Sequence, residues 1–147
     1  MKQRQNRDKQ KIILVVEDEM LLLEAIKKKL QLNDFAVIGA RSVDQALEYL
    51  KEIGDVDIIW LDHYLLGKKN GLDFAAELKK TGSPWKHIPI IVVGNSAGPF
   101  EIWKYYALGV AHYYLKAETR LDRIVRDINT LLGKNKPVRD RDRGEQR

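Results

Sequence analysis

The sequence predicts an α/β fold, a doubly wound domain built on a five-stranded parallel sheet. Short runs of β-branched and other apolar residues, typical of strands buried on both faces, alternate with longer segments in which apolar residues recur at helical spacing. Five such pairs follow one another without an internal repeat or linker. Strands that alternate with helices favour a parallel sheet with helices on both faces, because each crossover returns the chain to the same edge.

Two strand–helix pairs and a third strand are expected in the first half of the chain. Ser42-Val43-Asp44-Gln45 has the residue types of a helix-capping box, and Asn33 is a typical stop for the helix before it. The third strand is a continuous apolar run that ends abruptly on a carboxylate, Asp62. The expected ranges are strands at 11–16, 35–39 and 57–61 and helices at 21–30 and 43–53.

The second half of the chain continues the alternation. Gly71 opens a helix after a loop, Pro99 suits the first turn of the next helix, and Gly109 and Gly133 end the last two helices. The expected ranges are helices at 71–80, 99–108 and 121–132 and strands at 89–93 and 111–115.

The bulk composition restricts the class of protein. A chain of 147 residues is long enough for one domain with a proper core and too short for two ordinary ones. There is no cysteine, which excludes disulfides and thiolate metal sites. No apolar run has the length of a membrane span, and no charged-then-apolar leader opens the chain. We therefore expect a cytoplasmic protein without a membrane partner.

The net charge of +5 belongs to the two ends of the chain. Residues 1–10 and 134–147 each carry a net charge of +3, which leaves −1 for residues 11–133. Both ends are polar and almost without apolar residues, so we predict a disordered basic tail, a folded domain at 11–133 and a disordered charged tail. Such tails are more often solubilising than specific, and we expect no specific nucleic-acid partner.

Polar residues follow four of the five predicted strands. Glu17 and Asp18 follow the first, Asp62 the third, Gly94-Asn95 the fourth and Lys116 the fifth. The carboxyl ends of parallel strands share one edge of a sheet, where open α/β folds bind their ligands. Crowded carboxylates repel one another, and a hard divalent cation such as Mg²⁺ relieves this repulsion.

This group of residues suits phosphoryl transfer to an aspartate. Asp62 would be the phosphoryl acceptor, and Lys116 would pair with Asp62 or with a phosphoryl group placed on it. Each residue also has a plainer interpretation. Asp62 could cap a turn, Lys116 could be a surface lysine, and the acidic pair could favour the positive end of a helix.

These residues resemble the receiver domain of two-component response regulators, over about residues 11–133. The resemblance rests on the acidic pair after the first strand, the aspartate after the third, the glycine that opens the next helix, the proline before the fourth strand, a Leu-Gly turn, an aromatic residue and a lysine. These are Glu17, Asp18, Asp62, Gly71, Pro89, Leu108-Gly109, Tyr113 and Lys116.

The resemblance implies a flavodoxin-like (βα)5 fold with strand order 2-1-3-4-5. It implies that Asp62 accepts phosphate from a sensor histidine kinase, a phosphotransfer protein or a small phosphodonor, and that Lys116 contacts the phosphoryl oxygens. Tyr113 would be an aromatic side chain that changes rotamer on activation. The implied Mg²⁺ ligands are Glu17, Asp18, Asp62 and the backbone carbonyl of Tyr64.

Three positions depart from the family pattern. Gly94 stands where receivers usually have Thr or Ser, so the hydroxyl that would bind a phosphoryl oxygen is absent. Backbone N–H groups near Asn95, or Ser96 after a loop shift, could replace it. Ala117 follows the lysine in place of the usual proline. The loop after Asp62 has Leu66 where proline is common and reaches Gly71 one residue late.

The expected output is binding to a downstream protein. No output domain follows Gly133, which predicts a stand-alone receiver. The helix at 99–108 has large apolar residues on more than one side, more than one buried face needs. It is therefore either deeply packed or part of a face, at 99–133, that binds a partner or a second copy of the chain.

Two other functions compete with the phosphoacceptor switch. The first is a degenerate receiver that binds partners without phosphorylation, with Gly94 as the mark of a lost response. The second is a phosphatase with an aspartate nucleophile, but such enzymes need a second carboxylate two residues after the nucleophile, and Tyr64 stands there. We therefore expect no enzyme beyond self-phosphorylation and dephosphorylation. His63 and His112 lack partners at metal-ligand spacing.

Overall fold

The computed structural model describes residues 10–95, 98–133 and 137–139. In this part of the chain five parallel strands form one sheet in the order β2-β1-β3-β4-β5, which confirms the predicted fold and strand order. The strands are β1 (Ile12–Val16), β2 (Ala36–Ala40), β3 (Ile58–Leu61), β4 (Ile90–Gly94) and β5 (His112–Leu115). The helices are α1 (Met20–Leu32), α2 (Val43–Ile53), α3 (Gly71–Lys79), α4 (Pro99–Leu108) and α5 (Leu121–Leu131), with a 3₁₀ turn η2 at Lys116–Glu118.

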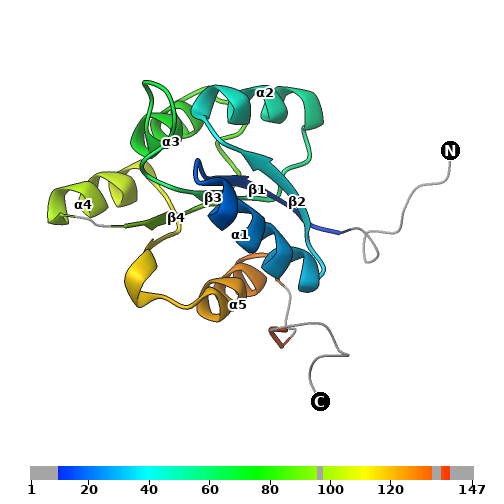
Figure 1. Ribbon diagram of the computed structural model, residues 1–147. Coiled ribbons are helices and arrows are strands. Elements are labelled where there is room, and N and C mark those ends of the chain that lie inside the picture. Colours follow the sequence, from blue (N-terminus) through cyan, green and yellow to red (C-terminus); the bar gives the residue numbers. More distant parts are fainter. Residues whose placement is uncertain (1–9, 96–97, 134–136, 140–147) are drawn as a thin grey trace, which may run out of the picture.

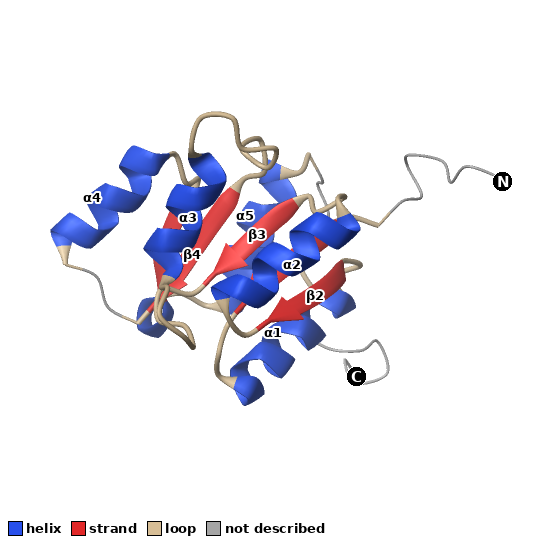
Figure 2. Cartoon of the chain, turned by 90° about the horizontal axis from the view of Figure 1, so that it is seen from above, coloured by secondary structure: helices blue, strands red, loops and turns tan. Residues whose placement is uncertain are grey.

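Helices cover both faces of the sheet, as Figures 1 and 2 show. Successive residues of a strand point to opposite faces, so each buried strand supplies two cores. On one face Leu14, Ile59 and Val92 pack against α2, α3 and α4. On the other face Ile13, Trp60 and Ile91 pack against α1 and α5. Every residue of β3 and β4 is buried, which explains why both segments are continuous apolar runs.

The predicted boundaries hold to within about two residues, and the caps show why. The Ser42 side chain accepts a hydrogen bond from the Gln45 N–H at 3.1 Å, while the Gln45 side chain accepts one from the Arg41 N–H at 2.7 Å. A full capping box, which the sequence analysis did not predict, starts α3, where Asn70 and Asp73 bond reciprocally.

Some predicted features lie outside the described residues. Ser96 is one, as are residues 1–9, 134–136 and 140–147. Residues 137–139 of the predicted C-terminal tail are described and contact the domain. The Arg139 N–H donates to Asn33 Oδ1 at 2.7 Å, and the Arg139 guanidinium lies 2.7 Å from the Asp34 carboxylate. Val138 packs against the core that the sheet forms with α1 and α5.

Two further points concern the described residues only. No helix among them is long and apolar enough to cross a lipid bilayer. All their peptide bonds are trans, including the one between Lys116 and Ala117.

The strand register determines which residues meet at the carboxyl edge of the sheet. Val16 pairs with Leu61, so the next residues, Glu17 and Asp62, are neighbours across two strands. Gly94 pairs with Leu115, which places Lys116 just beyond the end of β4. Gly71, the first residue of α3, lies directly against this edge. A Cβ there would lie 2.5 Å from the Asp62 carbonyl oxygen and 2.6 Å from the Tyr105 hydroxyl.

We predict that Gly71→Ala destabilises the protein, because its Cβ would meet backbone that cannot move without shifting β3. The expected loss is about 1–3 kcal/mol in the free energy of unfolding, typical of overpacking. Gly98→Ala is the matched control, since a Cβ at Gly98 would meet nothing within 4 Å. Urea unfolding of both variants measures the effect. Equal stability of the two would show that the edge tolerates a shift of α3.

Candidate functional site

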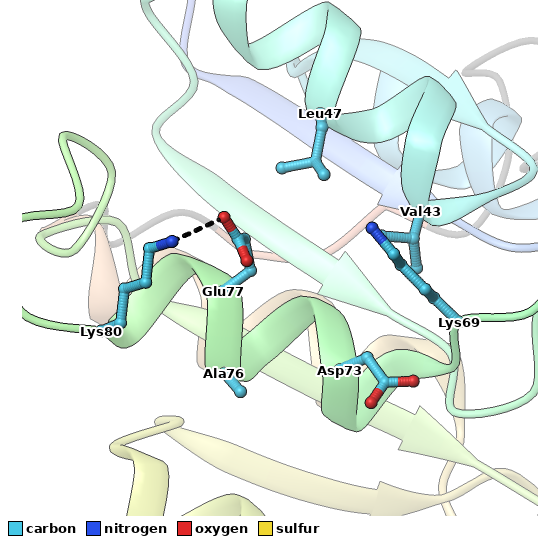
Figure 3. Close-up of a pocket in the computed structure, with 7 residues that line it drawn as sticks. All are labelled: Val43, Leu47, Lys69, Asp73, Ala76, Glu77 and Lys80. Atoms are coloured by element: carbon cyan, nitrogen blue, oxygen red, sulfur yellow. Dashed lines mark hydrogen bonds and ion pairs between the residues drawn. The ribbon is translucent and has the colours of Figure 1, made fainter.

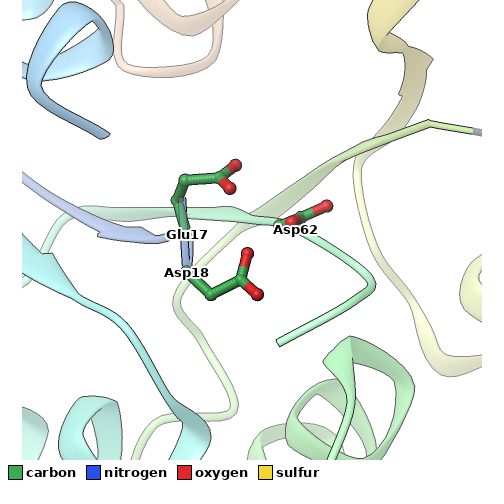
Figure 4. A group of neighbouring side chains, drawn as sticks. All are labelled: Glu17, Asp18 and Asp62. Atoms are coloured by element: carbon green, nitrogen blue, oxygen red, sulfur yellow. The ribbon is translucent and has the colours of Figure 1, made fainter. Parts of the chain in front are cut away.

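Three carboxylates gather at the carboxyl edge of the sheet. Oxygens of Glu17, Asp18 and Asp62 lie within 4.8 Å of one another. Figure 4 shows how Glu17 and Asp18, just after β1, lie beside Asp62, which follows β3. Glu17 and Asp62 are nearly inaccessible to solvent, with 1% and 3% of their surface exposed. The structure therefore brings together the carboxylates that the sequence analysis singled out.

Lys116 is the cation of this cluster. Its Nζ lies 3.1 Å from Glu17 Oε1 and 3.4 Å from Asp62 Oδ1. The contact with Asp62 is one of the two that the sequence left open for Lys116, and the contact with Glu17 is additional to them. Because Lys116 touches two carboxylates, it offsets part of their repulsion, and either carboxylate can be its partner if the other takes a new ligand.

The pKa values of the cluster reflect burial and mutual repulsion. Burial, and then the negative charge of Asp62, raise the pKa of Glu17 to about 7. Burial also raises the pKa of Asp62, against the opposing effect of Lys116. Burial alone would lower the pKa of Lys116, but the charges of Asp62 and Glu17 outweigh it and raise that pKa. The site is thus short of positive charge.

The β1–α1 loop is held in place by hydrogen bonds to its backbone. The Arg41 guanidinium donates from Nε and Nη2 to the Asp18 carbonyl at 3.0 and 2.8 Å. The Glu19 N–H donates to Glu17 Oε2 at 3.1 Å. Arg41 follows β2, which was the one strand end to which the sequence analysis assigned no residue. Its position just after a strand is the signal that could have identified Arg41.

The residue after Asp62 fixes the orientation of the Asp62 carboxylate. The His63 N–H donates to Asp62 Oδ1 at 2.8 Å, and the His63 carbonyl accepts from the Gly71 N–H at 2.7 Å. The His63 ring is buried: its Nδ1 lies 2.6 Å from the Tyr105 hydroxyl, and its Nε2 lies 3.4 Å from the Glu101 carboxylate. No sequence pattern predicted these two contacts, because they join the segment after β3 to α4, which lies far along the chain.

The Tyr113 side chain of β5 reaches Gly94 at the end of β4. A Cβ at Gly94 would lie 2.7 Å from the Tyr113 hydroxyl oxygen. That hydroxyl donates to Glu101 Oε2 at 2.6 Å. Burial and the bond to Glu101 raise the pKa of Tyr113, so the hydroxyl stays protonated. Asn95 is exposed in the loop that follows.

The other candidates lie at the margins of the site. Tyr64 has an exposed side chain whose ring meets the His63 ring edge-on, with centroids 4.7 Å apart. The His112 ring lies beside Tyr114 on β5, away from the carboxylates. Trp85 packs against the core beneath α2, α3 and α4.

Helix α4 has one fully buried aromatic residue and three exposed ones. Tyr105 is completely buried, whereas Phe100, Trp103 and Tyr106 are 80%, 67% and 46% exposed. Of the two interpretations that the sequence left open, the deeply packed helix is wrong. The exposed residues are spaced three apart and so form one stripe along the helix.

A groove between α2 and α3 is separate from this cluster. It has a volume of about 490 Å³ and contains none of the predicted site residues. Figure 3 shows its lining, with Glu77 and Lys80 joined across a 2.9 Å hydrogen bond. The lining residues are Val43, Leu47, Lys69, Asp73, Ala76, Glu77 and Lys80.

Known proteins resemble the chain in both sequence and structure. The family model of the response regulator receiver domain matches residues 13–129. The rice (Oryza sativa subsp. japonica) two-component response regulator ORR13 is 32% identical over 104 residues, which cover 71% of this chain and 84% of that protein.

Solved structures give the same result. The phosphorylated cyanobacterial phytochrome response regulator RcpA has a TM-score of 0.71 at 29% identity, covering 84% of this chain and 94% of its own. The Mn²⁺-bound form of the response regulator Rcp1 has a TM-score of 0.70 at 26% identity, covering 88% of this chain and 99% of its own. A family model that spans most of the chain, together with these relatives, shows that the chain belongs to the receiver domains of two-component response regulators.

Proposed function

We propose that Asp62 is the phosphoacceptor of a two-component phosphorelay and that a histidine kinase or a phosphotransfer protein donates the phosphoryl group. The observation that carries the proposal is the buried cluster of Glu17, Asp18 and Asp62 with Lys116 in contact. A carboxylate with a cation beside it can take up a phosphoryl group whose charge that cation then balances.

The donor set fits Mg²⁺. It consists of oxygens only, and burial and repulsion raise the pKa values of Glu17 and Asp62, as expected where a cation would relieve them. The ligands would be Glu17, Asp18, Asp62 and the backbone carbonyl of Tyr64. When bound, Mg²⁺ would neutralise charge on the transferring phosphoryl oxygens. The Mn²⁺-bound form of the similar regulator Rcp1 supports a divalent ion here.

Asp62 acts as the nucleophile. One carboxylate oxygen forms a bond to phosphorus while the bond from phosphorus to the donor's imidazole nitrogen breaks and the imidazole leaves. Lys116 then pairs with the phosphoryl oxygens, and its contact with Glu17 places it beside them. Gly94 supplies no hydroxyl, so among the described residues Lys116 and the backbone N–H groups near Asn95 would donate to the phosphoryl oxygens.

The output is binding to a downstream protein through the face formed by residues 99–133. The exposed stripe of Phe100, Trp103 and Tyr106 supports this, because a monomeric soluble domain rarely exposes three aromatic residues in a row along one helix. A second copy of the chain would use the same face. In either case the protein is a signalling switch, and its place of action is expected to be the cytoplasm.

One observation favours a second candidate, a receiver that binds partners without phosphorylation. Tyr113 already lies against Gly94 with its hydroxyl bonded to Glu101. If that arrangement were permanent, the face at 99–133 would not depend on Asp62. The retained carboxylates and Lys116 favour the phosphoacceptor, because a module that only binds partners has no use for three crowded acids.

We expect intact-mass analysis to show one phosphoryl adduct after incubation with acetyl phosphate and Mg²⁺. The adduct should be absent without Mg²⁺ and absent in Asp62→Asn. Asp57→Asn is the matched control, since Asp57 lies at the opposite edge of the sheet, where its carboxylate accepts from the Ile12 N–H. An adduct that persists in Asp62→Asn would place the acceptor elsewhere, and no adduct at all would favour the receiver that binds without phosphorylation.

Without Mg²⁺ we predict that stability falls as the pH rises from about 5 to about 7.5. The ordinary pKa of Glu17 is 4.5, against about 7 in the folded protein. Between these values the folded state keeps a proton that the unfolded chain releases, so the free energy of unfolding decreases with pH, by on the order of 2 kcal/mol. Asp62, whose pKa is also raised, acts in the same direction.

Urea unfolding at the two pH values, with and without Mg²⁺, measures this effect. Glu17→Gln should flatten the pH dependence because it removes the titrating group. Mg²⁺ should stabilise the wild type more at the higher pH, where the carboxylates are ionised. A wild-type stability that rises with pH over this interval would contradict the assignment.

A further inference from the structure

A chain of buried polar contacts links Asp62 to helix α4. His63 begins it: its backbone N–H donates to Asp62 Oδ1 at 2.8 Å, while its ring lies between Tyr105 and Glu101. The carboxylate beside Nε2 favours the tautomer with the proton on Nε2, which leaves Nδ1 to accept from the Tyr105 hydroxyl. Burial raises the pKa of Tyr105, so that hydroxyl stays a donor.

Glu101 connects the histidine to the tyrosine of β5. Its Oε1 lies 3.4 Å from His63 Nε2, and its Oε2 accepts from the Tyr113 hydroxyl at 2.6 Å. The Tyr113 N–H in turn donates to the Tyr106 hydroxyl at 3.0 Å. One carboxylate on the first turn of α4 thus contacts a group from the segment after β3 and a group from β5.

Gly94 is what makes room for this arrangement. A Cβ there would lie 2.7 Å from the Tyr113 hydroxyl oxygen and 3.8 Å from the His63 Cβ. Any larger residue would push the hydroxyl away from Glu101. The contacts of His63, Glu101 and Tyr113 therefore depend on the small residue at position 94, but none of them is made by a side chain at that position.

We propose that His63 is a positioning residue that couples the state of Asp62 to helix α4. The inference rests on Asp62 being the phosphoacceptor. In this proposal, the contacts of His63 with Tyr105 and Glu101 link phosphorylation to the exposed face of α4. The missing hydroxyl at Gly94 then does not disconnect the site from that face.

The physical basis is a change in the hydrogen bond that Asp62 accepts. As a carboxylate, Asp62 accepts a charge-assisted hydrogen bond from the His63 N–H. Once an oxygen of Asp62 is esterified to phosphorus, the acyl group no longer carries the full carboxylate charge, and this bond weakens. The peptide of His63 can then shift, and its ring moves against Tyr105 and Glu101, which both belong to α4.

Trp103 is a reporter on the far side of this helix. It lies two residues after Glu101 on α4 and is 67% exposed. The chain has three tryptophans, at positions 60, 85 and 103. With 5-fluorotryptophan incorporated, ¹⁹F NMR gives one signal for each tryptophan, and the signal that is missing in Trp103→Phe is that of Trp103. Acetyl phosphate with Mg²⁺ is the phosphodonor, and intact mass gives the phosphorylated fraction of each sample.

We expect the Trp103 signal of the wild type to shift on phosphorylation. In His63→Phe and in Glu101→Ala the shift, divided by the phosphorylated fraction, should fall at least about twofold, because His63→Phe removes both polar contacts of the His63 ring with α4 and Glu101→Ala removes the one with Glu101. His63→Gln should restore most of the shift, since its amide can still donate to Glu101. The matched controls, the exposed His87→Phe and Lys104→Ala, should shift like the wild type.

Several results would overturn the proposal. A full Trp103 shift in phosphorylated His63→Phe would do so, as would an unchanged Trp103 signal in phosphorylated wild type. If the wild type does not become phosphorylated, the proposed function fails and the coupling fails with it. If His63→Phe does not fold, the double variant Glu101→Ala/Tyr105→Phe decides, because it removes both polar contacts of the His63 ring: a full shift in that variant refutes the coupling and a reduced shift supports it.

Discussion

Repulsion among three carboxylates at the carboxyl edge of the sheet is the constraint on which the rest of the site depends. Glu17 and Asp62 are almost fully buried, and their oxygens lie within 4.8 Å of one another and of Asp18. Burial in a medium of low polarity strengthens repulsion between like charges. Lys116 offsets part of it by contacting Glu17 and Asp62 together. Burial, and then the repulsion that remains, raise the pKa of Glu17, and the remaining repulsion suits the cluster to a divalent cation.

The fold keeps these charges together at the cost of local stability. Strands β1 and β3 are buried on both faces, and their register places Glu17 beside Asp62. Arg41 holds the Asp18 carbonyl, His63 donates to Asp62, and the lack of a side chain at Gly71 lets α3 begin against the Asp62 carbonyl. The packed strands and helices around the carboxylates thus hold them close together in spite of their repulsion. This is typical of sites in which a bound cation relieves the repulsion.

The departure at Gly94 has a structural counterpart on the neighbouring strand. The space that a side chain would fill at Gly94 lies against the Tyr113 hydroxyl, which bonds to Glu101. Glu101 also lies beside His63, the residue whose backbone N–H donates to Asp62. Gly94 lacks the hydroxyl that the family usually has at this position. The polar contacts of Tyr113, Glu101 and His63 occur in the same part of the structure. Helix α4, which carries the exposed aromatic stripe, is the element where these contacts meet.

The sequence alone determined the fold class and the group of residues at the carboxyl edge, because these follow from local patterns, whereas the strand order was implied by the resemblance to receiver domains. Buried parallel strands are continuous apolar runs, and residues such as Asp62 and Lys116 directly follow them. Only the tertiary structure decided what those residues touch. The pairing of Lys116 with Glu17, the role of Arg41, and the contacts among His63, Glu101 and Tyr113 join elements far apart in the chain. Such contacts depend on side-chain packing between strands and helices, and no periodicity in the sequence encodes it.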